Sequence, residues 1–162
     1  MQAYIANLSK YNEGYLIGEW VDIDDDIRDT IHELLEKWGV EEYAVHDYDD
    51  VPEILVNKWG EWPDWDEVLE NLALIEEHGE EVYLAALACE ADLENYVGCF
   101  ESLEDWGKEY LDETGFFSEV SESIRDEVET YFDFKAWARD LELNGVVTSH
   151  EASLEEVHVF YN

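Results

Sequence analysis

The chain has 162 residues, of which 44 are Asp or Glu and 8 are Lys or Arg, so its formal net charge is −36. Hydrophobic residues make up 46% of the chain and aromatic residues 14%. This is ample material for a core and excludes an acidic disordered chain, because such chains are poor in aromatic residues. The charge also excludes nucleic acid as a direct partner, since phosphate is repelled and no basic stripe is present to displace its counterions.

Nothing in the sequence indicates a membrane or a secretory route. No run of about 18 apolar residues is present, and the first residues lack a basic stretch followed by an apolar one. We therefore expect a cytoplasmic protein without a membrane partner. Cys89 and Cys99 form no CxxC motif, and their apolar, helix-like surroundings predict two buried free thiols.

Residues 1–60 are predicted to form a small lobe of strands and one helix. The pattern of QAYIANLS predicts a strand, and YLIGEWVDI predicts a second strand after the turn KYNEG. Residues 24–26, all Asp, predict the start of a helix that ends at Gly39. The segment EEYAVHD predicts a third strand.

Residues 61–102 are predicted to be helical. Apolar residues at helical spacing predict one helix that ends at Gly79 and a second over residues 82–87. The spacing of Leu93, Tyr96, Val97 and Phe100 predicts a third helix.

Residues 103–162 are predicted to return to a mixed architecture. Ser102 predicts the cap of a helix that ends near Gly115, and Ser121 or Ser123 begins another that runs through Tyr131. A helical or turn-like piece follows, and GVVTSH and EVHVFYN predict closing strands. The sequence therefore predicts an α+β chain of three small lobes.

The negative charge is spread evenly along the chain. Residues 1–60, 61–102 and 103–162 carry net charges of −11, −13 and −12. On a compact globule these carboxylates would repel one another strongly, so we expect an elongated molecule. On duplex DNA, 36 charges occupy about 60 Å of the helix axis.

One motif suggests a metal site, and it is incomplete. Asp22, Asp24, Asp26 and Glu33 match four ligand positions of an EF-hand calcium loop, but Ile27 stands where that loop requires glycine. The alternative interpretation is a helix start with negative charge at the positive end of the helix dipole. We expect no metal and no cofactor.

The sequence also carries no sign of catalysis. Pairs of carboxylates arise by chance among 44 acids, and no GxSxG, HExxH or phosphate-binding glycine loop is present. We therefore expect that the protein is not an enzyme.

Two aromatic clusters leave alternatives open. Trp59, Trp62 and Trp65 form either a recognition patch or, as we favour, the packing between two lobes. A second cluster is either core or a self-association surface, because obligate interfaces are rich in aromatic residues. It consists of Tyr131, Phe132, Phe134 and Trp137.

Several segments together resemble the ArdA antirestriction family. They are YIANLSKYNEGYLIGEW, EEYAVHDYD, YLDETG and YFDFKAWARDLELNG. The resemblance covers nearly the whole chain, although residues 51–100 match mainly in acidity and helical character. It implies a protein of conjugative plasmids and transposons that imitates DNA and binds type I restriction-modification enzymes in the groove meant for duplex. It also implies an elongated three-lobed fold and a homodimer formed through the C-terminal lobe.

We expect carboxylates to take the place of phosphates in such a groove. The candidates flank the predicted helices and are Asp24, Asp25, Asp26, Asp29, Glu33, Glu36, Asp64, Asp66, Glu67, Glu70, Glu76, Glu77, Glu80, Glu81, Asp105, Glu109, Asp112 and Glu113. A calcium-binding protein and a chaperone of basic proteins remain the alternatives.

Overall fold

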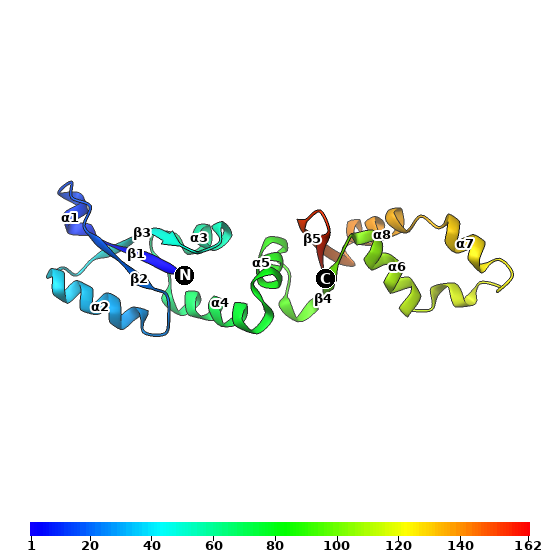
Figure 1. Cartoon of the computed structure of the whole chain (residues 1–162), viewed down its shortest axis with the longest axis horizontal. Helices are drawn as coiled ribbons and strands as arrows, with labels where there is room; N and C mark the ends of the chain where they lie inside the picture. The colour runs from blue at the N-terminus through cyan, green and yellow to red at the C-terminus, as the bar shows by residue number, and fades with distance from the viewer. The chain divides into compact units, whose positions relative to one another are not determined.

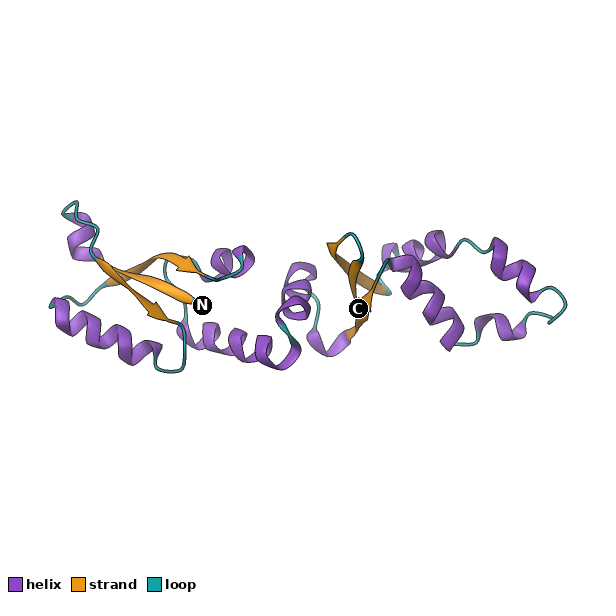
Figure 2. Ribbon diagram, viewed as in Figure 1, coloured by secondary structure: helices purple, strands orange, loops and turns teal.

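The computed structural model describes residues 1–162, and these form two compact units, Met1–Glu77 and His78–Asn162. Each unit combines helices with one three-stranded antiparallel sheet (Figure 2), which confirms the predicted α+β class. The division into three lobes and the elongated shape stay predictions. None of the helices is long and apolar enough to cross a membrane.

The first unit is built on a sheet with the strand order β2-β1-β3. Its elements, labelled in Figure 1, are β1 (Gln2–Asn7), α1 (Leu8–Asn12), β2 (Gly18–Asp22), α2 (Ile27–Trp38), β3 (Tyr43–Asp49), α3 (Glu53–Trp59) and α4 (Trp65–His78). The three strands lie close to the predicted ones. Helix α3 was not predicted.

Helix α2 supplies one side of the core of the first unit. Its buried residues, Ile27, Ile31 and Leu34, recur at helical spacing. Gly39 ends the helix with φ 66°, in the left-handed region that glycine adopts without strain, as its position in the sequence predicted.

The predicted first strand is too long. Its last two residues and the first part of the predicted turn form the helix α1 instead. The reason is local, since the side chain of Asn7 accepts a hydrogen bond from the backbone N–H of Lys10 at 3.0 Å and thereby caps this helix.

The tryptophans around Pro63 behave differently from one another. Trp59 and Trp65 are buried, and their indole N–H groups donate to Asn71 Oδ1 at 3.3 Å and to the hydroxyl of Tyr43 at 2.8 Å. Each contact joins a residue of the predicted segment 1–60 to a residue of the predicted segment 61–102, as we expected for packing between them. The expectation is wrong for Trp62, which is 63% exposed.

The second unit is built on a sheet with the strand order β4-β6-β5. Its elements are α5 (Glu80–Cys89), the 3₁₀ turn η1 (Leu93–Asn95), β4 (Tyr96–Phe100), α6 (Leu103–Glu113), the 3₁₀ turn η2 (Phe116–Glu119), α7 (Arg125–Tyr131), α8 (Phe134–Leu143), β5 (Val147–Ser153) and β6 (Glu156–Tyr161).

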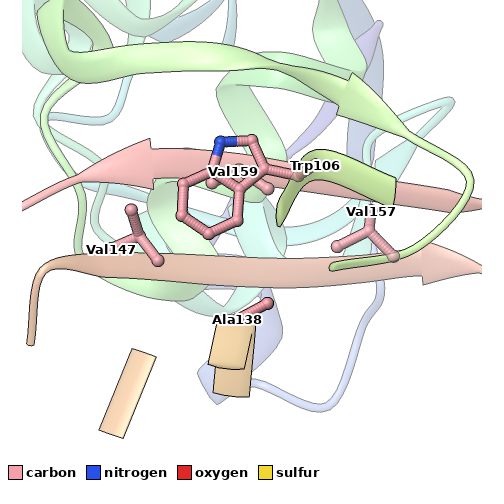
Figure 3. Packing of buried hydrophobic residues seen from close by; sticks show 5 residues of the cluster. All are labelled: Trp106, Ala138, Val147, Val157 and Val159. Atoms are coloured by element: carbon pink, nitrogen blue, oxygen red, sulfur yellow. The ribbon is translucent and has the colours of Figure 1, made fainter. Parts of the chain in front are cut away.

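Strand β6 is the centre of this unit and is covered on both faces. Val157 and Val159 pack with Trp106 of α6 and Ala138 of α8 in the cluster drawn in Figure 3. Phe160 packs against Ala85 and Ala86 of α5. Because both faces are buried, the segment VHVF lacks the alternation of a strand that has one face in water.

The helix predicted from the spacing of Leu93, Tyr96, Val97 and Phe100 is wrong. Only a 3₁₀ turn forms at Leu93–Asn95, and Tyr96–Phe100 is the edge strand β4, which pairs with β6. Tyr, Val and Phe favour strands, Gly98 disfavours a helix, and the partner strand lies more than 50 residues further along the chain. The middle segment is therefore not wholly helical.

This correction also changes the environment of the cysteines. Cys99 lies on β4 and is exposed, whereas Cys89 at the end of α5 is half-buried. The prediction of two buried thiols is therefore wrong for Cys99. Burial raises the pKa of the Cys89 thiol, against a hydrogen bond with Thr148 that lowers it.

Candidate functional site

Acidic side chains dominate the surface of both units. All but four of the 44 acidic residues are exposed, and those four, Glu104, Asp105, Glu129 and Glu142, are half-buried. Among the candidates named from the sequence, only Asp105 is half-buried, and the others are exposed. A surface of this kind attracts cations and repels anions.

The candidates of α2 lie in a stripe that faces away from the core. Asp29, Glu33 and Glu36 are spaced by four and three residues, which places them on one side of the helix, opposite the buried Ile31. They span about 10 Å of the helix axis, or one charge per about 5 Å. A single DNA strand carries one phosphate per about 3.4 Å, so the two densities are of the same order.

The Asp residues before α2 and α4 have a second, structural role. The backbone N–H of Asp26 donates to Asp24 Oδ1 at 3.1 Å, and that of Asp66 donates to Asp64 Oδ1 at 2.9 Å. The predicted start of α2 at Asp24–Asp26 is confirmed, but the predicted side-chain cap is not, because the side chain of Asp26 at the N-cap position makes no capping hydrogen bond.

Two candidates of α4 are paired with bases. Asp66 forms an ion pair with Arg28, and Glu67 forms one with Lys58 at 2.5 Å. Their charges are therefore partly compensated. The other α4 candidates, Glu70, Glu76 and Glu77, are exposed on the same helix.

In the second unit the candidates lie on α5 and α6. Glu80 and Glu81 occupy the first turn of α5, where negative charge favours the helix dipole. Glu109, Asp112 and Glu113 are exposed on α6.

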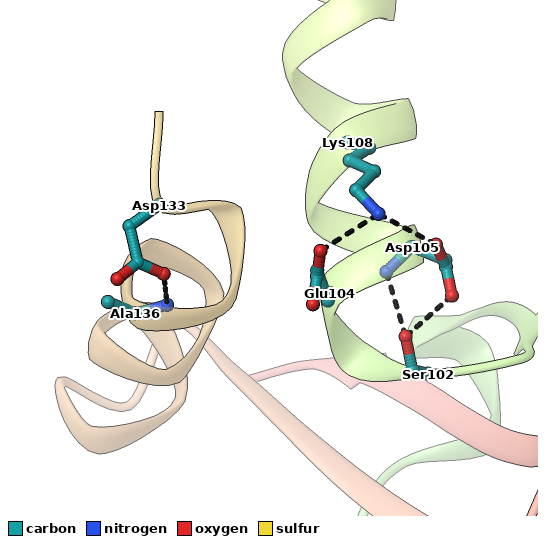
Figure 4. Close-up of polar contacts among 6 residues, drawn as sticks. All are labelled: Ser102, Glu104, Asp105, Lys108, Asp133 and Ala136. Atoms are coloured by element: carbon teal, nitrogen blue, oxygen red, sulfur yellow. Dashed lines mark hydrogen bonds and ion pairs between the residues drawn. The ribbon is translucent and has the colours of Figure 1, made fainter. Parts of the chain in front are cut away.

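Asp105 is held by several polar contacts at the start of α6, so its role is mainly structural (Figure 4). Ser102 Oγ donates to its carboxylate at 2.6 Å and accepts from its backbone N–H at 3.1 Å, and Lys108 Nζ lies 3.2 Å from Asp105 Oδ1. The hydrogen bond from Ser102 is the largest influence on the pKa of the Asp105 carboxyl and lowers it. Burial, the next largest, raises this pKa, and the hydrogen bond and charge of Lys108 lower it again, so that it lies below its ordinary value.

Most of the basic side chains are used inside the molecule. Five of the eight form ion pairs with carboxylates: Lys10 with Glu13, Arg28 with Asp66, Lys37 with Glu19, Lys58 with Glu67, and Lys108 with Glu104 and Asp105. Arg125 donates instead to the backbone carbonyls of Phe117, Ser118 and Val120. These pairs consume few of the acids, so a large excess of uncompensated carboxylates remains.

The structure adds Glu41 and Glu42 to the candidates. They line a hollow of about 500 Å³ at the C-terminal end of α2, together with Ser9, Asn12, Gly39 and Val40. The sequence signal is a pair of adjacent acids that begins two residues after the helix-ending Gly39, because the helix C-terminus adds its own negative partial charge there.

The residues predicted for self-association do not share one environment. Tyr131 is 82% exposed, whereas Phe132, Phe134 and Trp137 are partly buried in a cluster of aromatic rings with Phe117. The structure thus places three of the four in intramolecular packing.

Chemistry-bearing side chains other than carboxylates are few. His158 is buried on β6 with its Nδ1 at 3.0 Å from the hydroxyl of Tyr96, and burial lowers its pKa. No group of three or more His, Cys, Asp or Glu side chains is arranged to hold a metal ion.

Fold and surface together define a small α+β protein whose exposed surface is overwhelmingly anionic and whose bases are mostly engaged internally. The model of one protein family, described as antirestriction protein (ArdA), matches residues 3–156. The chain therefore belongs to the ArdA family of antirestriction proteins, as the sequence resemblance predicted. A comparison with curated proteins yields no match. Family membership gives the chain an antirestriction function, with a restriction-modification enzyme as partner.

Proposed function

We propose that the chain imitates duplex DNA and occupies the DNA-binding groove of a type I restriction-modification enzyme. Carboxylates take the place of phosphates and contact the Lys and Arg side chains of the groove. The observation that carries this proposal is the exposed carboxylate surface, of which internal bases compensate only a small part. In this mechanism the protein performs no chemistry and acts by occlusion.

The proposed contact surface comprises the eighteen candidates and the two glutamates at the end of α2. Contributions within it are unequal, because a carboxylate already paired with a base attracts a second cation less strongly. Asp66, Glu67 and Asp105 should therefore contribute less than the stripe of Asp29, Glu33 and Glu36 on α2. No Lys or Arg pairs with this stripe, and its one basic partner is His32, whose Nε2 lies 3.5 Å from Glu36 and carries charge only when the ring is protonated.

The setting of this function follows from the family. We propose that the protein acts in the cytoplasm, protects the DNA of a conjugative plasmid or transposon as it enters a cell, and forms a homodimer through its C-terminal region. Tyr131, Phe132, Phe134 and Trp137 stay the proposed dimer residues, of which Tyr131 offers the most exposed surface.

A cleavage assay with competing DNA tests the mechanism. The purified protein is titrated into an ATP-dependent type I cleavage reaction at increasing concentrations of duplex that contains the recognition site. We expect inhibition that weakens as the duplex concentration rises, because both ligands compete for one groove. Inhibition that is independent of the duplex concentration would contradict occlusion of the groove. Binding to unrelated basic proteins that duplex DNA does not displace would favour a chaperone instead.

Charge-neutralising variants test the surface. The triple variant Asp29→Asn, Glu33→Gln and Glu36→Gln should weaken inhibition by about tenfold, since several weak ionic contacts are lost together. The matched control changes Glu122, Glu127 and Glu155 to Gln, because these three are exposed acids outside the candidate set. Equal effects of the two triple variants would show that total charge matters and the α2 stripe does not.

A further inference from the structure

Two bases of α8 stand apart from all others in the chain. Lys135 and Arg139 lie one turn apart on this helix and are exposed. Neither has an ion-pair or hydrogen-bond partner within the chain, in contrast to the other six bases. In a molecule with 44 acids, two adjacent unpaired cations need an explanation.

The surroundings of these two bases explain why they remain unpaired. They line a hollow of about 310 Å³ together with Ser102, Leu103, Glu104 and Glu142. Both glutamates are engaged elsewhere, since Glu104 lies 2.9 Å from Lys108 Nζ and Glu142 accepts a hydrogen bond of 2.5 Å from Ser149. Neither glutamate forms an ion pair with Lys135 or Arg139, so the hollow presents two unpaired cations beside two carboxylates.

The same region of the chain offers apolar surface. Leu143 at the end of α8 is 70% exposed, Val146 in the following turn is 44% exposed, and Tyr131 before α8 is 82% exposed. Apolar residues combined with unpaired charges are typical of a protein interface and less so of a site for a small anion.

We propose that Lys135 and Arg139 bind carboxylates of a second copy of this chain. Charge complementarity favours this occupant, because each copy supplies many exposed carboxylates. The cationic groove of a target enzyme would instead be repelled by the two bases, and a free polyanion would be repelled by the net charge of −36.

This inference rests on the homodimer of the proposed function and gives that dimer an electrostatic mechanism. Two copies with the same large negative charge repel each other, so they associate best where the local charge is least negative. Helix α8 carries two acids and two bases and is such a place. The ion pairs there would also set which residues of the two copies meet, since like charges placed opposite one another are strongly unfavourable.

Charge reversal tests the inference through the dimer dissociation constant, measured by sedimentation. The variant Lys135→Glu and Arg139→Glu should weaken dimerisation by about tenfold or more, whereas Lys135→Arg and Arg139→Lys should leave it close to that of the unchanged protein. The matched control, Lys10→Glu and Lys37→Glu, alters the net charge equally at two bases of the first unit and should have a much smaller effect. Equal weakening in the control would overturn the inference and leave only a general charge effect.

Zero-length cross-linking tests the contact directly. A carbodiimide joins a lysine amine to a carboxylate only when the two touch, and a mixture of ¹⁵N-labelled and unlabelled protein distinguishes links between copies from links within one copy. We expect Lys135 to be joined to an Asp or Glu of the other copy. If the protein dimerises, Lys135 forms no such link and the charge-reversal variant dimerises normally, the inference about Lys135 and Arg139 is overturned and the proposed homodimer stands. A chain that inhibits the enzyme but is monomeric would overturn the proposed dimer as well, and leave the proposed inhibition intact.

Discussion

At the scale of single residues, Ser102 shows how one side chain both begins a helix and sets a charge. Its hydroxyl accepts the backbone N–H of Asp105 and donates to the carboxylate of the same residue. The helix α6 that begins here carries Trp106, which is buried in the core of the second unit. The cap therefore supports the core as well as the start of the helix.

We predict that Ser102→Ala lowers the free energy of unfolding by about 1 kcal/mol, the usual value of such a cap. It should also raise the pKa of the Asp105 carboxyl toward its ordinary value, because the hydrogen bond from Ser102 is the largest cause of its lowered pKa. Urea unfolding measures the first effect, and titration by NMR measures the second.

The lowered pKa of Asp105 also predicts a pH dependence. A carboxyl whose pKa is lower in the folded state stabilises the fold above its unfolded pKa of about 4. That contribution is lost as the pH falls below about 4 through the folded pKa, and Ser102→Ala should reduce this loss. Ser123→Ala is the control, since Ser123 is exposed and its hydroxyl only contacts that of Ser121. An equal effect of both substitutions on stability would contradict the role given to the cap.

At the scale of elements, the close approach of α6 and α8 depends on Gly107. A Cβ atom at this position would lie 3.0 Å from the Cβ of Ala138 and 3.5 Å from the ring of Trp137. Ala138 is fully buried, so it cannot move aside without a shift of α8. Glycine at position 107 therefore allows the two helices to pack closely, although glycine lowers the intrinsic stability of α6.

We predict that Gly107→Ala destabilises the fold by up to about 2 kcal/mol, because an overpacking cost of about 1 to 3 kcal/mol outweighs a gain of about 1 kcal/mol in helix propensity. Chemical unfolding of the purified variant measures the change.

The double variant Gly107→Ala and Ala138→Gly is the control, since it moves the methyl group from one helix to the other. It should recover part of the lost stability through a favourable coupling between the two sites. A single variant that is more stable than the unchanged protein would show that α8 adapts freely.

At the scale of the whole molecule, the net charge of −36 acts on stability and on inhibition in opposite directions. Self-repulsion destabilises the compact state, whereas attraction to a cationic groove favours binding. Salt screens both interactions, and the Debye length falls from about 30 Å at 0.01 M to about 3 Å at 1 M.

We predict that raising the salt concentration over this range increases the thermal unfolding midpoint by several degrees and weakens inhibition by more than about tenfold. Scanning calorimetry and the cleavage assay measure the two effects. Sodium and potassium chloride should act alike if screening is the cause. A midpoint that falls with salt would show that the internal ion pairs outweigh the repulsion.

The local elements of this protein could be predicted because their signals are close together in the sequence. Ser102 caps α6 through a residue three positions away, and Gly39 ends α2 where the apolar period stops. The candidate carboxylates were also predictable as exposed, because an unpaired charge is very costly to bury.

Other features depend on partners that are distant along the chain. Strand β4 was mistaken for a helix because the apolar residues there recur at helical spacing, whereas the hydrogen bonds that make it a strand run to the distant β6. The pairing of Asp66 with Arg28 and of Glu67 with Lys58 could not be predicted either, because it requires the first turn of α4 to come within ion-pair distance of residues on α2 and α3.

By itself the sequence determined the excess of negative charge, the α+β class and the ArdA family. Composition, the spacing of apolar residues and the segments that resemble the family can all be read from the order of the amino acids. Tertiary structure alone decided which carboxylates are compensated and that Lys135 and Arg139 are left without partners. The physical reason is that an ion pair forms only within about 4 Å, and such distances between remote residues exist only after the chain has folded.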